Sequence, residues 1–196
     1  MSIKNSYTTA DYIEWNTAVN LVNRLFKDKE YRISLLIGCG IFFGLRISDL
    51  LQLTWDMVLD TTSFVITEKK TKKRREVKIN SSFQKHIQDC FQALNITNKD
   101  EKLFLSARGR VYSIQRVNVI LKEIKQKYGL KTVKNISSHS LRKTFGRHIY
   151  EKADTNGEMA LALLSELFNH SNISITKRYL GIRQEEILEC YELLDF

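Results

Sequence analysis

The chain contains no proline in its 196 residues. Average usage near 5% would place roughly ten prolines in a chain of this length. Proline breaks helix interiors and central strands, so it normally divides a fold into short elements. Only eight glycines are present as well, so little interrupts the backbone. The composition therefore predicts long, uninterrupted helices.

Apolar residues recur at helical spacing along most of the chain. The segment Ile33–Phe43 is apolar nearly all round, as expected for a central buried helix. Only Phe64–Thr67 and Arg75–Ile79 indicate strands, joined as a hairpin by a basic stretch. The fold class expected is mainly α with a small antiparallel β-sheet (α+β), in a single domain over residues 1–196. The other helices are expected at residues 12–26 (cap candidates Thr8 and Thr9), after Ser48, at 83–91, 114–128, from Ser138 to Ile149, at 159–168, and through Ile187, Leu188, Tyr191 and Leu194.

The net charge of +9 is concentrated in two blocks. Residues 67–80 hold seven Lys and Arg against two Glu, and residues 102–147 hold twelve against one. Residues 148–196 are acidic, with four basic groups against nine acidic ones. Basic charge focused in this way favours binding to a polyanion, because neutralised phosphates release counterions. Double-stranded DNA is the partner this pattern favours, although a solvated surface without a partner has the same composition.

Several protein classes are excluded by what the chain lacks. No apolar run approaches the length of a membrane span, and the N-terminus has no apolar secretory segment. Cys39, Cys90 and Cys190 are odd in number and have no metal-ligand spacing, so we expect reduced thiols in a cytoplasmic protein. There is no glycine-rich phosphate loop and no paired-histidine metal helix. We therefore expect no membrane contact, no cofactor and no metal.

The stretch Ser138-His-Ser-Leu-Arg142 is a candidate anion site. If Ser138 caps a helix, His139 and Arg142 lie on one face of its first turn. The unpaired N–H groups of a helix N-terminus also favour an anion there. The alternative is that His139 only caps the helix and Arg142 is a surface charge.

Arg46 directly follows the buried helix, between two apolar residues. A planar guanidinium held there suits two phosphate oxygens. The alternative is a structural ion pair with Asp49 or Asp56. Lys70, in the basic hairpin turn, could deliver a proton to a bound substrate, or be one solvated lysine among several.

A tyrosine and a second histidine complete the set. A tyrosine oxygen can attack phosphorus to form a covalent ester where nearby cations stabilise the developing charge. Tyr179 follows Arg178 and lies nine residues after His170. Taken alone, Tyr179 is one of eight tyrosines and could equally be a packing residue.

In order and spacing, these stretches resemble the tyrosine recombinase (phage integrase) family. The resemblance runs from about Thr8 to Ile182. It rests on Gly44-Leu-Arg-Ile-Ser-Asp-Leu-Leu-Gln-Leu-Thr-Trp55, Lys70-Thr71, His139-Ser-Leu-Arg142, Asn169-His-Ser171 and Thr176-Lys-Arg-Tyr179. It implies the tyrosine recombinase catalytic-domain fold and one active site made of Arg46, Lys70, His139, Arg142, His170 and Tyr179. The chain departs from the family pattern at Asn169, where glycine is common, but Asn tolerates left-handed backbone conformations.

The resemblance also implies how the chain acts. Tyr179 would form a 3′-phosphotyrosyl link with DNA, and a second strand would reverse the step to integrate, excise or invert a DNA element. The usual DNA-core-binding domain is not present in residues 1–196, as in the short members that invert promoter segments. The family also implies a homotetramer on DNA, with a monomer when free, and docking of the segment 183–196 on a neighbouring protomer. Contacts to the DNA backbone are expected from Lys69, Lys72, Arg74, Arg108, Arg110 and Arg116.

Three other functions use the same residues. A type IB topoisomerase nicks and reseals one strand without exchanging partners. A metal-independent nuclease would use two histidines as acid and base and would form no covalent adduct. A non-catalytic DNA-binding module would keep only a relict site, which the complete residue set argues against.

Overall fold

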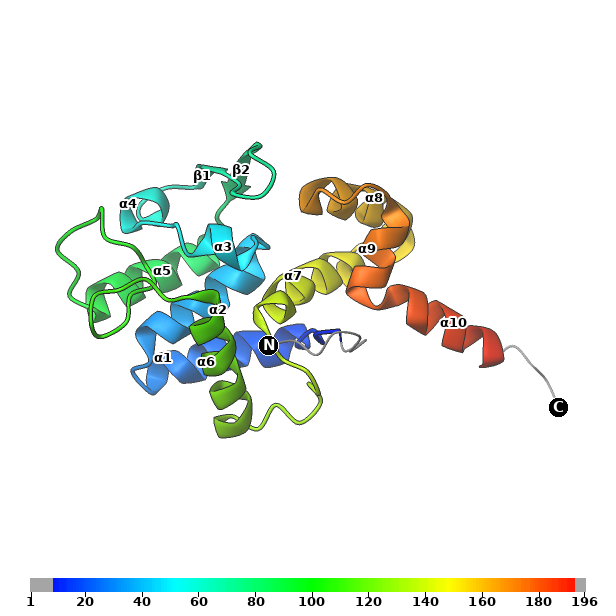
Figure 1. Cartoon of the computed structure of the whole chain (residues 1–196), viewed down its shortest axis with the longest axis horizontal. Coiled ribbons are helices and arrows are strands. Elements are labelled where there is room, and N and C mark those ends of the chain that lie inside the picture. Colours follow the sequence, from blue (N-terminus) through cyan, green and yellow to red (C-terminus); the bar gives the residue numbers. More distant parts are fainter. Residues whose placement is uncertain (1–8, 193–196) are drawn as a thin grey trace. The chain divides into compact units, whose positions relative to one another are not determined.

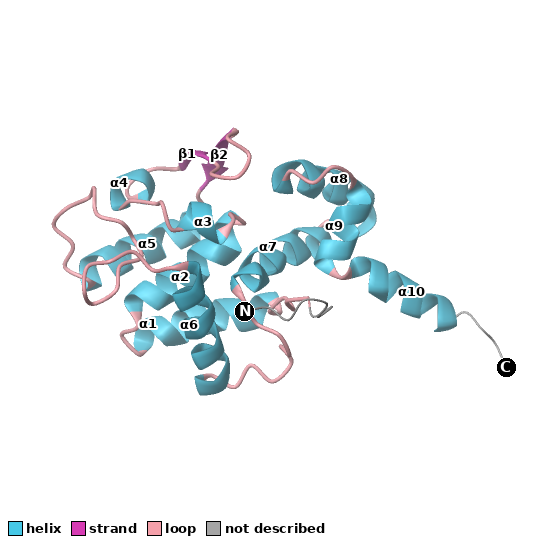
Figure 2. Ribbon diagram, viewed as in Figure 1, coloured by secondary structure: helices cyan, strands magenta, loops and turns pink. Residues whose placement is uncertain are grey.

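The computed structural model describes residues 9–192, except for the side chains of Gln184 and Cys190. This part of the chain is mainly helical with one two-stranded antiparallel sheet, which confirms the expected fold class (Figure 2). Thr8 and Leu194 lie outside the described residues. The elements labelled in Figure 1 are α1 (Trp15–Lys27), α2 (Tyr31–Phe43), α3 (Ile47–Leu50), α4 (Trp55–Val58), β1 (Ser63–Thr67), β2 (Arg74–Lys78), α5 (Ser81–Ala93), α6 (Ile114–Lys127), α7 (Ser138–Lys152), α8 (Gly157–Phe168), α9 (Ile173–Leu180) and α10 (Ile182–Glu192). A short 3-10 helix, η1 (Asp154–Asn156), connects α7 to α8.

The chain divides into two compact units, and each is described by itself. The first ends at Phe145 and the second begins at Gly146, so helix α7 runs from one into the other. The first unit contains α1 to α6 and the hairpin, and the second contains α8 to α10. Arg46, Lys70, His139 and Arg142 belong to the first unit, and His170 and Tyr179 belong to the second.

The core of the first unit surrounds α2, as its apolar sequence predicts. Every residue of α2 from Ile33 to Phe43 is buried except Phe42, which stacks on Phe83 of α5 with ring centroids 4.4 Å apart. Helices α1 and α5 both pack against α2. Trp55 and Phe104 are fully buried in the same core.

The hairpin has the antiparallel register expected of two strands joined by residues 68–73. Thr67 pairs with Arg74 and Ser63 pairs with Lys78. Phe64, Ile66 and Val77 point into the core, and the alternate positions are more exposed. One face of the hairpin is thus packed while the other carries polar side chains.

Two helix starts differ from the sequence expectations. Glu14, rather than Thr9, caps α1, because its carboxylate accepts hydrogen bonds from the backbone N–H groups of Asn16 and Thr17. Helix α3 begins at Ile47, before Ser48. The short α4 and the helix α9 were not predicted at all.

The second unit has a smaller core between α8 and α9. Leu161, Leu164, Phe168 and Leu180 are buried there. Gly146 allows this packing, since a Cβ at that position would lie 2.7 Å from a methyl group of Leu180. In α10, which the sequence predicts as the last helix, Ile187, Leu188 and Tyr191 are exposed. None of the helices within residues 9–192 combines the length and the apolar character needed to cross a membrane.

Candidate active site

Arg46 follows a left-handed turn at the end of α2. Helix α2 ends on Gly44, whose φ of 57° lies in the region that glycine adopts without strain. Two residues later, Arg46 precedes the first turn of α3, and its guanidinium is partly buried. Arg46 Nη1 donates a hydrogen bond to Glu68 Oε2 at 2.7 Å. The hairpin therefore folds back onto the end of α2 through this ion pair.

Glu68 is the partner that the sequence interpretation missed. The alternative for Arg46 was an ion pair with Asp49 or Asp56, and the structure shows one with Glu68, which lies in the first position after β1 and is 3% exposed. Burial alone would raise the pKa of this carboxyl. The hydrogen bonds from Thr71 and Arg46 and the charges of Arg46 and Arg142 nevertheless hold its pKa below the usual range. The only sequence signal was an acidic residue at the edge of a strongly basic stretch.

Arg142 is held on the same turn as Arg46. It lies in the second turn of α7, is 5% exposed, and donates from Nη1 to the carbonyl oxygen of Gly44 at 2.7 Å. Its charge also acts on Glu68. The structure thus brings Arg46 and Arg142 to one place in the first unit, although 96 positions separate them in the sequence.

Helix α7 begins at Ser138, as the sequence predicts, but its cap lies one residue earlier than expected. Ser137, not Ser138, caps the helix: its hydroxyl accepts from the His139 N–H at 3.3 Å, while Ser140 Oγ accepts from the Ser137 N–H at 3.1 Å. His139 lies in the first turn of α7 and is exposed overall, although part of its ring is covered. Partial burial and the charges of Arg142 and Lys143 lower the pKa of His139, so its ring is neutral at pH 7.

The turn after β1 presents a row of basic side chains. Lys69 and Lys70 are exposed, and so are Lys72 and Arg74. The fully buried Asp49 anchors this turn to α3, since its Oδ1 accepts a hydrogen bond from the Lys69 N–H at 2.8 Å. Asp49 Oδ2 has no hydrogen-bond partner within the described part of the chain.

The remaining residues expected on DNA are exposed elsewhere in the first unit. Arg108 and Arg110 lie in the loop closed by the bridge between Leu105 and Val111. Arg116 lies on α6 and forms a 3.4 Å ion pair with Glu123. A pair this exposed contributes little stability, so Arg116 can exchange partners.

The second unit brings His170 and Tyr179 together. Their ring centroids are 5.4 Å apart, and Phe168 lies edge-on to both rings. His170 Nδ1 lies 2.9 Å from the hydroxyl of the fully buried Thr176, which orients the imidazole. Asn169 adopts φ 53° and ψ 49° at the end of α8, so the left-handed turn expected there forms with Asn in place of glycine.

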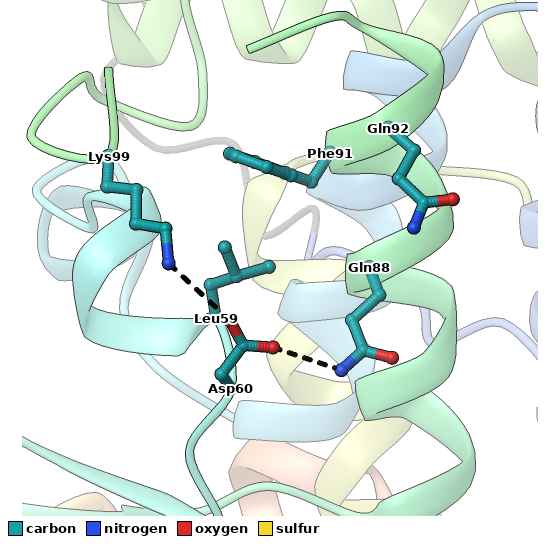
Figure 3. Close-up of a pocket in the computed structure, with 6 residues that line it drawn as sticks. All are labelled: Leu59, Asp60, Gln88, Phe91, Gln92 and Lys99. Carbon is teal, nitrogen blue, oxygen red and sulfur yellow. Dashed lines mark hydrogen bonds and ion pairs between the residues drawn. The ribbon is translucent and has the colours of Figure 1, made fainter. Parts of the chain in front are cut away.

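Other features of the described residues lie apart from these candidates. Cys39 and Cys90 are free and buried, whereas the side chain of Cys190 is outside the description. Within the described part of residues 9–192, no group of three His, Cys, Asp or Glu side chains is arranged to hold a metal ion. Figure 3 shows a hollow in which Asp60 bonds Gln88 and pairs with Lys99, and no candidate site residue lines it.

Comparison with known proteins places these residues in a family. The sequence profile of the phage integrase family matches residues 13–186. The chain is 34% identical over 174 residues to the probable integrase/recombinase YoeC of Bacillus subtilis, covering 88% of this chain and 90% of YoeC. It is 29% identical to the tyrosine recombinase XerC of Caldanaerobacter subterraneus over 87% of this chain, but that match spans only 46% of XerC.

Solved structures agree on the fold. XerA recombinase matches with a TM-score of 0.68 at 17% identity, over 97% of this chain and 68% of XerA. XerH recombinase, solved on its difH substrate after cleavage, matches with a TM-score of 0.66 at 21% identity, over 98% of this chain and 56% of XerH. The profile match over most of the chain and the likeness to YoeC together show that the chain belongs to the phage integrase family, the tyrosine recombinases that break and rejoin DNA.

Proposed function

We propose that this chain is a site-specific DNA recombinase in which Tyr179 cuts one strand by forming a 3′-phosphotyrosyl bond. The observation that carries the proposal is the convergence of two buried or partly buried arginines, Arg46 and Arg142, on the Gly44 turn beside a helix N-terminus. Such a cluster suits a phosphate whose negative charge grows in the transition state.

In the cleavage step, Tyr179 Oη forms a bond to phosphorus as the bond from phosphorus to the 5′ oxygen breaks. The neutral His139 ring accepts the tyrosine proton, and Lys70 donates a proton to the leaving 5′ oxygen. Arg46 and Arg142 bind the non-bridging oxygens, and His170 gives a further contact. Loss of one such donor costs about a hundredfold or more in rate.

The second step reverses the first. The 5′-hydroxyl oxygen of another strand forms a bond to the phosphorus of the phosphotyrosine. The bond from phosphorus to Tyr179 Oη breaks, and the tyrosine is released. Because the phosphotyrosine conserves the energy of the phosphodiester, the exchange needs no nucleotide cofactor. XerH and lambda integrase have been solved on DNA, and lambda integrase as a dimer. For this chain we propose a homotetramer on double-stranded DNA, held by the segment 183–196 docking on the next protomer.

The test is covalent capture on nicked DNA. Duplexes with a randomised central region and a nick just beyond it are incubated with the protein, since the fragment released after cleavage diffuses away and traps the adduct. Wild type is expected to form adducts whose sequencing defines a substrate, and Tyr179→Phe is expected to form none. Tyr150→Phe is the matched control, because Tyr150 is a tyrosine of α7 in the same unit and lies outside both the candidate site and the segment 183–196.

The outcomes separate the competing functions. Strand transfer between two labelled duplexes is expected of a recombinase, whereas relaxation of supercoils without transfer would identify a topoisomerase. Cutting by Tyr179→Phe without an adduct would identify a nuclease. Binding without any cutting by wild type, on every duplex of the pool, would leave only a DNA-binding module.

A further inference from the structure

Glu68 forms more hydrogen bonds and ion pairs in the first unit than is usual for an exposed glutamate. It is 3% exposed, whereas Glu76 of the same hairpin is exposed and accepts a single bond, from Ser63 Oγ. A buried carboxylate requires partners that offset its desolvation. The contacts of Glu68 fall into two groups, one with arginines and one with the lysine-bearing turn, which we define as residues 68–73.

The first group is a set of three guanidinium groups. Arg46 bonds Glu68 Oε2 at 2.7 Å, Arg75 Nη1 lies 3.9 Å from Oε1, and Arg142 acts on Glu68 through its charge. Arg75 is fixed in turn by a 3.1 Å bond to the Phe43 carbonyl at the end of α2. Three like charges around one point repel one another, and Glu68 offsets part of that repulsion.

The second group closes the lysine-bearing turn. The Glu68 N–H donates to the Lys73 carbonyl at 3.0 Å, and the Glu68 carbonyl accepts from the Lys72 N–H at 2.9 Å. Thr71 Oγ1 donates to Glu68 Oε2, the same oxygen that accepts from Arg46. One carboxylate oxygen therefore joins the turn that carries Lys70 to the guanidinium of Arg46.

The Glu68 carboxylate could either occupy the place of a DNA phosphate until DNA binds or hold Arg46 in place throughout. Its burial distinguishes these two roles. A carboxylate that stands in for DNA would lie at the surface, where a phosphate could displace it. Glu68 is instead covered, while Arg46 is about one-fifth exposed. A guanidinium carries five N–H donors, so a phosphate that reaches the exposed part of Arg46 does not have to displace the Glu68 bond.

We propose that Glu68 is a positioning residue that fixes the Arg46 guanidinium and the lysine-bearing turn in one arrangement for the attack on the scissile phosphate. This role rests on the proposed recombinase function. It deepens that function, because it makes the positions of the arginine and of the lysine depend on one acidic side chain.

The first experiment needs no DNA. Hydrogen exchange at the Lys72 and Lys73 amides is compared between wild type and Glu68→Gln, which removes the charge with little change of shape. Exchange is expected to be about tenfold faster or more in the variant, because the turn opens locally. Glu76→Gln, the matched control on the same hairpin, is expected to exchange like wild type.

The second experiment separates binding from cleavage on the duplex selected by wild type. The rate of adduct formation at saturating DNA is expected to fall about tenfold to a hundredfold in Glu68→Gln, since misplacement of catalytic groups by about 1 Å has that effect. DNA affinity is expected to stay unchanged or to increase, because a negative charge is removed. Replacing the leaving 5′ oxygen by sulfur should restore part of the rate, since a thiolate leaves without a proton from Lys70. General destabilisation would not respond to this change of leaving group.

The outcomes distinguish a failure of the role proposed for Glu68 from a failure of the proposed function. The role of Glu68 alone would be refuted if a folded Glu68→Gln protein exchanged its turn amides at the wild-type rate. It would also be refuted if that protein cleaved DNA at or above the wild-type rate. No adduct from wild type would refute the proposed function, and with it this role. If Glu68→Gln does not fold, Thr71→Ala removes the side-chain bond from the turn to Glu68 together with the 3.3 Å bond from the Lys73 N–H to Thr71 Oγ1. The Lys72 amide is then the exchange readout, and the same pattern at smaller size is expected.

Discussion

Replacing Gly44 by Ala should damage both stability and the position of Arg142. Gly44 has φ +57°, which costs an L-residue about 1–2 kcal/mol. A Cβ built there would lie 2.4 Å from Phe145 Cδ1, far inside van der Waals contact. Overpacking of this kind costs about 1–3 kcal/mol. The free energy of unfolding is therefore expected to fall by about 2–5 kcal/mol.

Gly129→Ala is the matched control. Gly129 also follows a helix and has φ +67°, but a Cβ there meets nothing within 4 Å. Only the backbone term of about 1–2 kcal/mol applies to it. The gain from reducing the freedom of the unfolded chain is common to both variants and cancels in the comparison. The difference between them, about 1–3 kcal/mol, isolates the clash with Phe145.

The assay is urea unfolding followed by tryptophan fluorescence. Trp15 and Trp55 are the two tryptophans of the chain and both lie in the first unit, so the signal reports the unit that contains Gly44. Adduct formation is measured under native conditions, because the Gly44 carbonyl holds Arg142. Equal stability and equal adduct rates for Gly44→Ala and Gly129→Ala would refute the reasoning.

Three further predictions concern single groups. The lowered pKa of His139 keeps it neutral at pH 7, so the adduct rate should fall only as the pH drops through a value below 6.5; His139→Gln should lose this acid limb in a pH–rate series. Asn169→Gly should retain stability or gain up to about 1 kcal/mol in thermal unfolding, since Asn169 has φ 53°, whereas Asn169→Val should lose stability. Burial raises the pKa of Cys90 to about 12 and that of Cys39 well above its usual range, so both should resist alkylation until urea unfolds the chain, as peptide mass mapping would show.

Much of the fold could be predicted because its helices are long and periodic. Residues 33–43 and 114–128 carry enough apolar positions for the spacing to identify a helix. The four-residue helices α3 and α4 are too short for any period to show. Their positions depend on packing, of α3 against α2 and of α4, which contains the buried Trp55, against β1 and α5. Caps were harder to predict, because Ser137 and Ser138 are chemically equivalent in the sequence. The folded bonds distinguish them: Ser137 Oγ accepts from the His139 N–H, and the Ser137 N–H donates to Ser140 Oγ.

Prediction of the candidate site from the sequence was limited for a different reason. Arg46, Arg142 and Tyr179 could be selected from the sequence because each lies in a motif with a fixed spacing. Glu68 lies in no such motif, and its contact with Arg46 spans 22 residues through the fold of the hairpin. Pairing between distant side chains is set by which strand packs on which helix end, and the sequence pattern does not contain that information. The sequence therefore indicated the two arginines of the proposed phosphate site but not the carboxylate that holds one of them.

The charge of the two units divides the proposed work between them. Residues 1–145 carry 26 Lys and Arg against 13 Asp and Glu, whereas residues 146–196 carry 5 against 9. On the proposed function, the net charges favour DNA binding by the first unit and disfavour it by the second, so we expect most of the affinity for the DNA backbone to come from the first unit. We expect Tyr179, in the acidic unit, to depend on that affinity rather than on its own attraction to DNA. Substitutions that weaken DNA binding should therefore cluster before residue 146, and those that abolish the adduct without weakening binding should include Tyr179.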